Sequence, residues 1–245
     1  MFISIITPTF NSEKFLSNCL ISVKNQNFEN YEHIIIDNCS YDKTITIIKG
    51  FDNPKLKLIS ESDSGIYDAM NKGIAASSGE YLLFLNSDDI LVDNFFLNNA
   101  NKILLKNNID ILYSNIIYKK NFLGFSRKYI TGEISKINKI GNHIPHPGSL
   151  IKKTFLSNMN NFDTSYKISA DFDFFIKAKN HEKTNYHYYN KFTVLMSSGG
   201  ASSGLKNIFY ANIECYKSLK KNNENFPILF IFVKLLRKFL QFLKI

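Results

Sequence analysis

Short apolar runs alternate with helix-like stretches along the first hundred residues of the chain. The apolar runs have the length of buried strands and stop at a proline or a polar residue; they cover 2–7, 33–37, 55–60 and 81–85. Between them, apolar residues recur at helical spacing over 13–25, 42–48 and 66–77, with Ser12 and Asp42 as expected caps of the first two helices. Because strands and helices alternate, the pattern predicts an α/β fold with a doubly wound, mostly parallel sheet.

The regular alternation stops after a helix predicted at 93–106. The expected strands that follow cover 111–118, 125–130 (in a hairpin around 121–124), 186–189 and 193–196, with a helix at 171–179. Two prolines and a glycine make 144–150 a constrained loop that leads into a short strand. We expect residues 1–225 to form one domain, in which 111–225 is a smaller antiparallel extension of the parallel half at 1–110.

The final twenty residues differ in character from the rest of the chain. An apolar run at 226–233 is followed by Lys234, Arg237, Lys238 and Lys244 at helical spacing, with Leu and Phe between them. The apolar part is far shorter than the roughly 20 residues that cross a bilayer. The pattern predicts an amphipathic helix at 226–245 that lies on an anionic membrane surface. A helix docked on the domain, with solvated lysines, is the alternative.

The chain of 245 residues has a formal net charge of +9, which raises the question of a polyanionic partner. Its lysines are scattered apart from those of the tail, so we expect no nucleic-acid binding. The three cysteines lie far apart without a metal-ligand spacing and indicate reduced thiols. The apolar run at the N-terminus is too short for a signal peptide, and we therefore expect a cytoplasmic protein.

Acidic residues follow three of the predicted strands: Asp37, Asp63 and the pair Asp88-Asp89. Ligands of doubly wound sheets bind beyond the carboxyl ends of the strands, where these carboxylates would meet. A hard cation such as Mg²⁺ prefers oxygen ligands of this kind. Taken alone, an Asp-Asp pair after a strand more often caps a helix or ends a turn.

Four segments in this order resemble the inverting family 2 glycosyltransferases. They are SIITPTFN at 4–11, IIIDNCSYDKT at 34–44, SESDSGIYDAMNKGIAASSG at 60–79 and YLLFLNSDD at 81–89. Further matches at 145–149, 166–171 (YKISAD) and 198–202 (SGGAS) are similar to the branch that includes colanic acid and other exopolysaccharide transferases. The resemblance reaches about residue 203. It implies the GT-A fold and a nucleotide-diphosphate sugar as donor.

The resemblance also implies which residues bind the donor. Thr7 and Pro8 would lie beside the nucleotide, Asp37 would accept hydrogen bonds from the base, and Asp63 with Gly65 would close over the nucleoside, followed by Asn71 on the next helix. Asn86, Ser87 and Asp88 occupy the family's DxD position, with Asn in place of the first Asp. Asp88 and Asp89 would hold Mg²⁺ or Mn²⁺, and the sequence leaves open which of them is the main ligand.

Asp171 resembles the family's catalytic base, and His146, held between two prolines, would contact the diphosphate or the acceptor. The mechanism implied is a one-step displacement that moves a sugar, with a UDP-sugar as the expected donor, to a hydroxyl of a glycan or lipid-linked glycan at the inner face of the cytoplasmic membrane. Gly199 and Gly200 would form a flap whose backbone amides meet phosphate, with a plain flexible loop as the alternative. A homodimer stays open.

Two other classes compete with this interpretation. A dinucleotide-dependent oxidoreductase would need a glycine-rich GxGxxG turn after the first strand, where this chain has Thr7-Pro8-Thr9. A catalytically weak or inactive GT-A nucleotide-sugar-binding protein stays open because Asn86 contributes no charge to a metal site.

Overall fold

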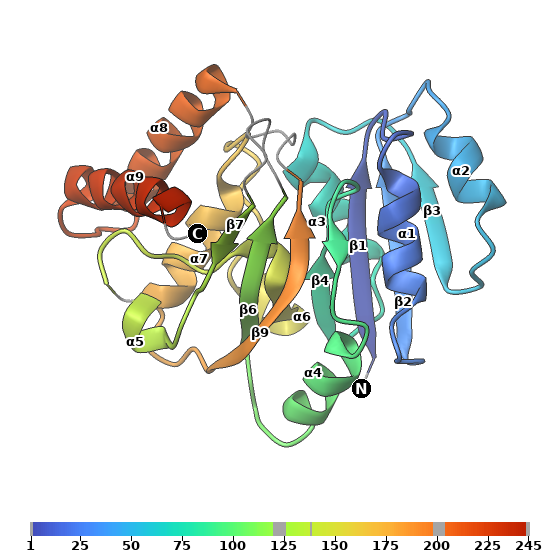
Figure 1. Cartoon of the computed structure of the whole chain (residues 1–245), viewed down its shortest axis with the longest axis horizontal. Helices are drawn as coiled ribbons and strands as arrows, with labels where there is room; N and C mark the ends of the chain where they lie inside the picture. The colour runs from blue at the N-terminus through green and yellow to red at the C-terminus, as the bar shows by residue number, and fades with distance from the viewer. Residues whose placement is uncertain (1, 120–125, 138, 198–203, 244–245) are drawn as a thin grey trace.

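The computed structural model describes residues 2–119, 126–137, 139–197 and 204–243. The hairpin predicted around 121–124 and the flap at Gly199-Gly200 lie outside these residues. The described residues form a nine-stranded sheet in the order β3-β2-β1-β4-β8-β6-β9-β5, with β7 paired to β6 (Figure 1). The strands are β1 (Ile3–Thr9), β2 (Tyr31–Asp37), β3 (Leu56–Ser60), β4 (Tyr81–Phe84), β5 (Ile90–Leu91), β6 (Ile111–Tyr118), β7 (Arg127–Tyr129), β8 (Ser149–Lys152) and β9 (Tyr186–Met196).

The predicted parallel half is confirmed. Strand β1 lies between β2 and β4, all three run in the same direction, and β3 continues the parallel order beyond β2. Every residue of β1, β2 and β4 is buried, which explains why their sequences are nearly continuous apolar runs. Helices α1 (Leu16–Lys24), α2 (Thr44–Gly50) and α3 (Ile66–Ala76) connect these strands.

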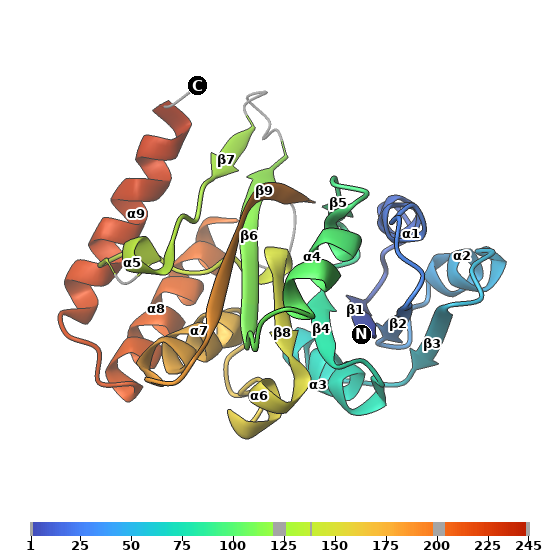
Figure 2. The same cartoon turned by 90° about the horizontal axis from the view of Figure 1, so that it is seen from below.

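The sheet has a hydrophobic core on each face, because successive strand residues point to opposite sides. Ile3 and Ile5 of β1 pack with α1 and with α4 (Phe96–Leu104) on one face. Ile6 packs on the other face with α3, α6 (Lys153–Asn158) and α7 (Ala170–Asn180). Figure 2 shows α1 and α4 on one side of the sheet and α3, α6 and α7 on the other. The layers thus follow the doubly wound pattern.

The second half adds antiparallel strands to the same sheet. Strand β8 is antiparallel to β4 and β6 is antiparallel to β8, so β6 again runs in the direction of β4, and β9 is parallel to β6. The prediction of two separate strands at 186–189 and 193–196 was wrong. They form one strand, because register shifts around Asn115 on β6 accommodate the extra residues of β9 without ending the pairing.

Several local features were not predicted or were predicted wrongly. Strand β5, α5 (Ile134–Ile137), α6 and α8 (Leu205–Lys221) were missed. Ser12 does not cap α1 with its side chain: α1 begins at Leu16, and the Ser12 hydroxyl lies 2.8 Å from that of Ser87. Asp42 accepts a hydrogen bond from the Thr44 amide, but the N-cap position of α2 is Lys43, which has no side-chain cap bond, so the predicted cap lies one residue too early.

The C-terminal helix α9 (Pro227–Leu243) docks on α8 and α7 (Figures 1 and 2). Phe230 is buried against Phe172, Cys215 and Leu219, and the Lys234 ammonium lies 3.1 Å from the sulfur of Cys215. The lysines of this helix are therefore not simply solvated. Its outer side carries exposed apolar residues instead: Ile228, Leu229, Phe232, Leu235 and Leu236, with Phe226 exposed just before the helix. Within the described residues, no helix has the length and apolarity needed to cross a membrane.

Candidate functional site

One edge of the sheet collects the ends of most of its strands. Strands β1 to β4, β6 and β9 all run toward this edge, and the antiparallel strands β7 and β8 begin there. A cleft of about 990 Å³ opens at this edge. Pro8, Asp63, Asp88, His146 and Asp171 all line it, although they are spread over more than 160 positions of the chain. The topology therefore brings most of the predicted site residues to one cavity.

Two of the predicted donor residues lie beneath the cleft and not on its surface. Thr7 is fully buried, and its hydroxyl lies 2.9 Å from Nε2 of His33. Asp37 is also fully buried, and its two carboxylate oxygens accept bonds from Thr9 Oγ1, from the Ser40 amide and hydroxyl, and from Ser60 Oγ. The carboxylate thus pins the ends of three strands together, while its neighbour Asn38 lines the cleft.

Asp63 and Gly65 lie on the cleft wall immediately before α3. The Asp63 carboxylate accepts a hydrogen bond from the Gly65 amide at 2.9 Å, and burial raises the pKa of Asp63. Gly65 has φ +139°, a conformation that favours glycine, and the space beside its Cα is open to the cleft. Asn71 does not line the cleft. Its side-chain amide exchanges two hydrogen bonds with the backbone of Phe162, so it joins α3 to the loop before α7.

The segment Asn86–Asp89 presents oxygen ligands to the cleft. Asp88 is partly exposed there, and burial raises its pKa. Asp89 is almost wholly buried; its oxygens accept bonds from the Ser197 amide and from Asn86 Nδ2, and burial followed by the charge of Asp88 raises its pKa well above the ordinary value. Asn86 Oδ1 is buried without a hydrogen-bond partner among the described residues.

These oxygen ligands fit a divalent cation whose remaining ligands would be phosphate oxygens of the substrate. Among the described residues, no cluster of three or more His, Cys, Asp or Glu side chains is arranged to enclose a metal ion. Mg²⁺ does not need such a cage, since one or two carboxylates plus phosphate oxygens suffice. Asp88 offers the accessible carboxylate, and the orphaned Asn86 oxygen offers a neutral ligand next to it.

Asp171 lies in the first turn of α7 and faces the cleft. One of its oxygens lies 2.7 Å from the hydroxyl of Tyr67, which is also 2.8 Å from the carbonyl of Ile168. Tyr67 is buried on α3, so a side chain from the parallel half fixes the carboxylate of the other half. Sequence reasoning missed Tyr67; its motif position in DSGIYDAMNKG was the available signal.

His146 lies in a short 3-10 turn (His146–Gly148) just before β8. Its ring packs against Phe84 and Phe162, with ring centroids 5.1 Å and 5.3 Å away, and burial lowers its pKa. Nε2 is buried and has no hydrogen-bond partner among the described residues. A neutral imidazole with one unused nitrogen is therefore available at the cleft.

Basic side chains form a second group on the cleft wall, which sequence reasoning also missed. The four residues that line it are Lys119 just after β6, Arg127 of β7, Lys167 in the loop before α7, and Lys238 of α9. The recurring lysines of the tail were noticed, but only the packing of α9 turns Lys238 toward the cleft.

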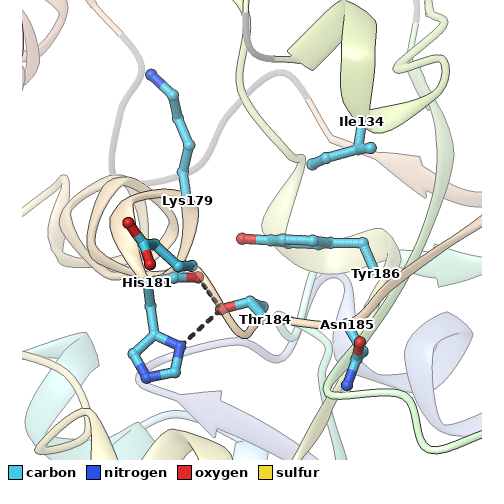
Figure 3. Close-up of a pocket in the computed structure, with 7 residues that line it drawn as sticks. Ile134, Lys179, His181, Thr184, Asn185 and Tyr186 are labelled. Atoms are coloured by element: carbon cyan, nitrogen blue, oxygen red, sulfur yellow. Dashed lines mark hydrogen bonds between the residues drawn. The ribbon is translucent and has the colours of Figure 1, made fainter.

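A smaller cavity of about 320 Å³ lies at the opposite end of α7 and β9 (Figure 3). There His181 Nδ1 lies 3.2 Å from the hydroxyl of Thr184, and Lys179 is paired with Glu224 at 2.8 Å. The buried hydroxyl of Tyr186 in this cavity has no hydrogen-bond partner among the described residues. None of the predicted site residues lines this cavity, so the candidate chemistry stays at the larger cleft.

Comparison with known proteins assigns this geometry to a family. The model described as Glycosyl transferase family 2 matches residues 4–168. The UDP-Glc:alpha-D-GlcNAc-diphosphoundecaprenol beta-1,3-glucosyltransferase WfgD of Escherichia coli is 33% identical over 141 residues, which cover 56% of this chain and 54% of WfgD. The poly(ribitol-phosphate) beta-N-acetylglucosaminyltransferase TarP of Staphylococcus aureus is 31% identical over 244 residues, which cover 90% of this chain and 72% of TarP.

A solved structure shares the fold. Staphylococcus aureus TarS 1-349 in complex with UDP-GlcNAc superposes with a TM-score of 0.71 at 20% identity, over 91% of this chain and 65% of that chain. This similarity confirms the GT-A fold that the resemblance implied. The chain therefore belongs to glycosyl transferase family 2 and is a glycosyltransferase of GT-A fold.

Proposed function

We propose that the protein transfers a sugar from a UDP-sugar to an acceptor hydroxyl with inversion at the anomeric carbon. One observation carries the proposal: Asp63, Asp88 and Asp171 line a single cleft. Asp63 and Asp88 lie at the ends of parallel strands, where doubly wound folds bind nucleotides. Asp171 comes from the other half of the chain and lines the same cleft, whose volume of about 990 Å³ has to hold donor and acceptor.

The donor binds across the ends of β1 to β4. Pro8, Asn38 and Asp63 contact the nucleoside, and Gly65 allows close approach of the backbone. Asp37 supports this surface from beneath; a direct bond to the base requires it to release one of its four present donors. The complex of TarS with UDP-GlcNAc supports the choice of uridine.

Asp88 is the main metal ligand in this proposal, with Asn86 Oδ1 beside it and Asp89 as the buried support that orients both. A bound Mg²⁺ or Mn²⁺ would supply positive charge to the departing diphosphate. Asp89 is less suited to bind it directly, because its oxygens are occupied by Ser197 and Asn86.

Asp171 acts as the general base for the acceptor hydroxyl. The attacking oxygen forms a bond to the anomeric carbon, the bond to the diphosphate oxygen breaks, and the hydroxyl proton goes to the carboxylate of Asp171. Tyr67 holds this carboxylate in position. His146 is neutral and supplies a hydrogen bond from or to Nε2 at the acceptor side.

The acceptor is a lipid-linked glycan at the inner face of the cytoplasmic membrane, to which the protein binds peripherally. The exposed apolar side of α9, which includes Ile228 and Phe232, supports this part of the proposal, since it has no cover among the described residues. The acceptor named for WfgD is a lipid-linked diphosphate sugar. Replacement of Ile228 and Phe232 by Asp should shift the protein from the vesicle-bound to the free fraction in a flotation assay.

The central test replaces Asp171 by Asn. UDP should bind with unchanged affinity, while transfer should fall about 10²- to 10⁴-fold, the usual contribution of a general base. Replacement of Asp173 by Asn is the matched control, because Asp173 lies two residues away on α7 and bonds Ser218 and Lys177 outside the cleft. Full turnover by the Asp171 variant would remove it from this role, and absence of UDP binding by the unmodified protein would reject the donor.

A further inference from the structure

The basic side chains of the cleft wall gather around Tyr118, at the end of β6. Arg127 is its partner across the β6–β7 ladder, and the guanidinium carbon of Arg127 lies 3.8 Å from the centroid of the Tyr118 ring. Only 7% of Arg127 is exposed. Stacking on an aromatic ring fixes the plane of a guanidinium, which makes it a directed donor toward phosphate oxygens.

Cations from α9 converge on the same place. The pKa of Lys238 is lowered by burial and by the positive charges of Arg127 and Lys234. The pKa of the nearby His143 is lowered to about 3 by burial and by the charges of Lys234, Arg127 and Arg237. Positive charges from β7 and α9 therefore lie close enough to oppose one another.

No carboxylate in the described part of the chain forms an ion pair with Lys119, Lys234 or Lys238. Like charges held together in a partly buried place destabilise the fold, unless an anion joins them. Elsewhere a partly buried lysine is paired with a carboxylate, as Lys179 is with Glu224. The arrangement is that of a binding site for an anionic ligand.

The position of the basic side chains around Tyr118 indicates that the anionic ligand is part of the acceptor and not of the donor. Tyr118, Arg127 and Asp171 line the same cleft, so the basic group borders the cavity that the proposed base faces. Asn86 and Asp88 would hold the cation that binds the donor phosphates, so the donor does not need this second basic group. Helix α9 also turns Lys238 inward and its exposed apolar residues outward. A phosphate at the cleft and a hydrocarbon chain outside are thus separated by about 10–12 Å, one helix diameter.

We propose that Arg127 and Lys238, assisted by Lys119, bind the phosphate or diphosphate group that joins the acceptor sugar to a lipid, while the hydrocarbon chain follows the outer side of α9. This assignment rests on the proposed transfer reaction and specifies its acceptor class. It gives α9 two roles in one helix, as a wall of the acceptor site and as the contact with the lipid phase.

The test measures binding of decyl diphosphate, a lipid diphosphate without a sugar, to the full chain by calorimetry, with and without saturating UDP. The variant carries Arg127→Gln and Lys238→Gln together. Lys128→Gln is the matched control, because Lys128 lies next to Arg127 on β7 but is exposed and points away from the cleft toward Phe192. Should the double variant unfold, Lys238→Gln alone is used, since Lys238 is only partly buried.

We expect the double variant to bind decyl diphosphate at least tenfold more weakly, with UDP affinity unchanged and with the Lys128 variant equal to the unmodified protein. Inorganic pyrophosphate should bind the unmodified protein at least tenfold more weakly than decyl diphosphate. Equal binding of pyrophosphate and decyl diphosphate would overturn the assignment to a lipid. If the double variant lost UDP binding as strongly as decyl diphosphate binding, Arg127 and Lys238 would belong to the donor site, and the proposal would be wrong. Unaltered decyl diphosphate binding in the variant would overturn the site itself. UDP binding by the unmodified protein, measured separately, tests the proposed donor independently.

Discussion

The bond between Tyr67 and Asp171 leads to a sharp prediction, because it joins the two halves of the chain at the proposed base. Tyr67→Phe removes one hydroxyl and keeps the ring, whose centroid lies 5.7 Å from that of Phe162. A hydrogen bond to a charged group contributes about 1.5–3 kcal/mol. Since 1.36 kcal/mol corresponds to a factor of ten in rate, complete loss of this orienting bond lowers kcat by about 10- to 150-fold.

The assay is steady-state transfer at saturating UDP-sugar, accompanied by UDP binding and thermal unfolding. The KM for the donor should not change, since the Tyr67 hydroxyl bonds Asp171 and the carbonyl of Ile168 and none of the groups proposed to contact the donor. Tyr113→Phe is the control: Tyr113 is fully buried, and its hydroxyl donates to the carbonyl of Gly132 at 3.1 Å, outside the cleft.

Two results would refute the reasoning. If Tyr67→Phe kept its kcat and lost only stability, the hydroxyl proton would go to the carbonyl of Ile168 and not to Asp171. If the control lost as much activity as Tyr67→Phe, the effect would be a general consequence of removing a buried hydroxyl.

Three further predictions concern the fold and the metal. Glu32 is only 2% exposed. Burial by itself raises the pKa of its carboxyl, but hydrogen bonds from Lys57, Ser4 and Ser78 outweigh burial and lower this pKa from 4.5 to about 2. This pKa shift corresponds to about 3 kcal/mol of stability that is present above pH 4.5 and lost as the pH falls through 2. In urea unfolding, the difference in free energy of unfolding between the unmodified protein and Glu32→Gln should therefore shrink between pH 5 and pH 2. Asp88→Ala should abolish the gain in UDP affinity that Mn²⁺ confers, and an unchanged gain in calorimetry would exclude Asp88 as the main ligand. Gly79→Ala should cost about 1–3 kcal/mol, because its Cβ would lie 2.5 Å from the backbone nitrogen of Ser4, whereas Gly50→Ala meets no atom within 4 Å and should leave Tm nearly unchanged.

The Asn86 departure from the DxD pattern has a simple structural reading. Asn86 Nδ2 donates to Asp89, a bond that an aspartate at this position could not make. An aspartate at position 86 would repel the buried carboxylate of Asp89, to which Asn86 now donates. The amide therefore lowers the electrostatic free-energy cost of holding Asp88 and Asp89 in this segment. The loss of one negative charge is then compatible with a working site, because Asp88 keeps its accessible carboxylate.

The local pattern of the chain determined the parallel half of the fold. Strands β1, β2 and β4 are buried on both faces, so their apolar runs and their order along the chain were sufficient to predict a doubly wound sheet. Strand β9 was divided in two in the prediction, because a bulge breaks the alternation of the sequence without breaking the pairing. Short elements such as β5 depend on their partners and leave almost no periodic signal.

For the candidate site, motif positions gave residue identities, but only tertiary packing decided what each side chain faces. Asp63, Asp88, His146 and Asp171 line one cleft, whereas Asn71 bonds a backbone segment some ninety positions away. Asp37 is buried because three strand ends meet at its carboxylate.

Tyr67 and Lys238 became candidates only through the structure. Each lies on a helix that packs against a part of the chain distant in the sequence. Helix α3 brings Tyr67 to Asp171, and α9 brings Lys238 to the cleft wall that also contains Arg127. Sequence by itself determined which residues end each strand and which face of each helix is apolar, since both follow from local geometry. The partners across the cleft were decided by the tertiary structure, because long-range packing sets which surfaces meet.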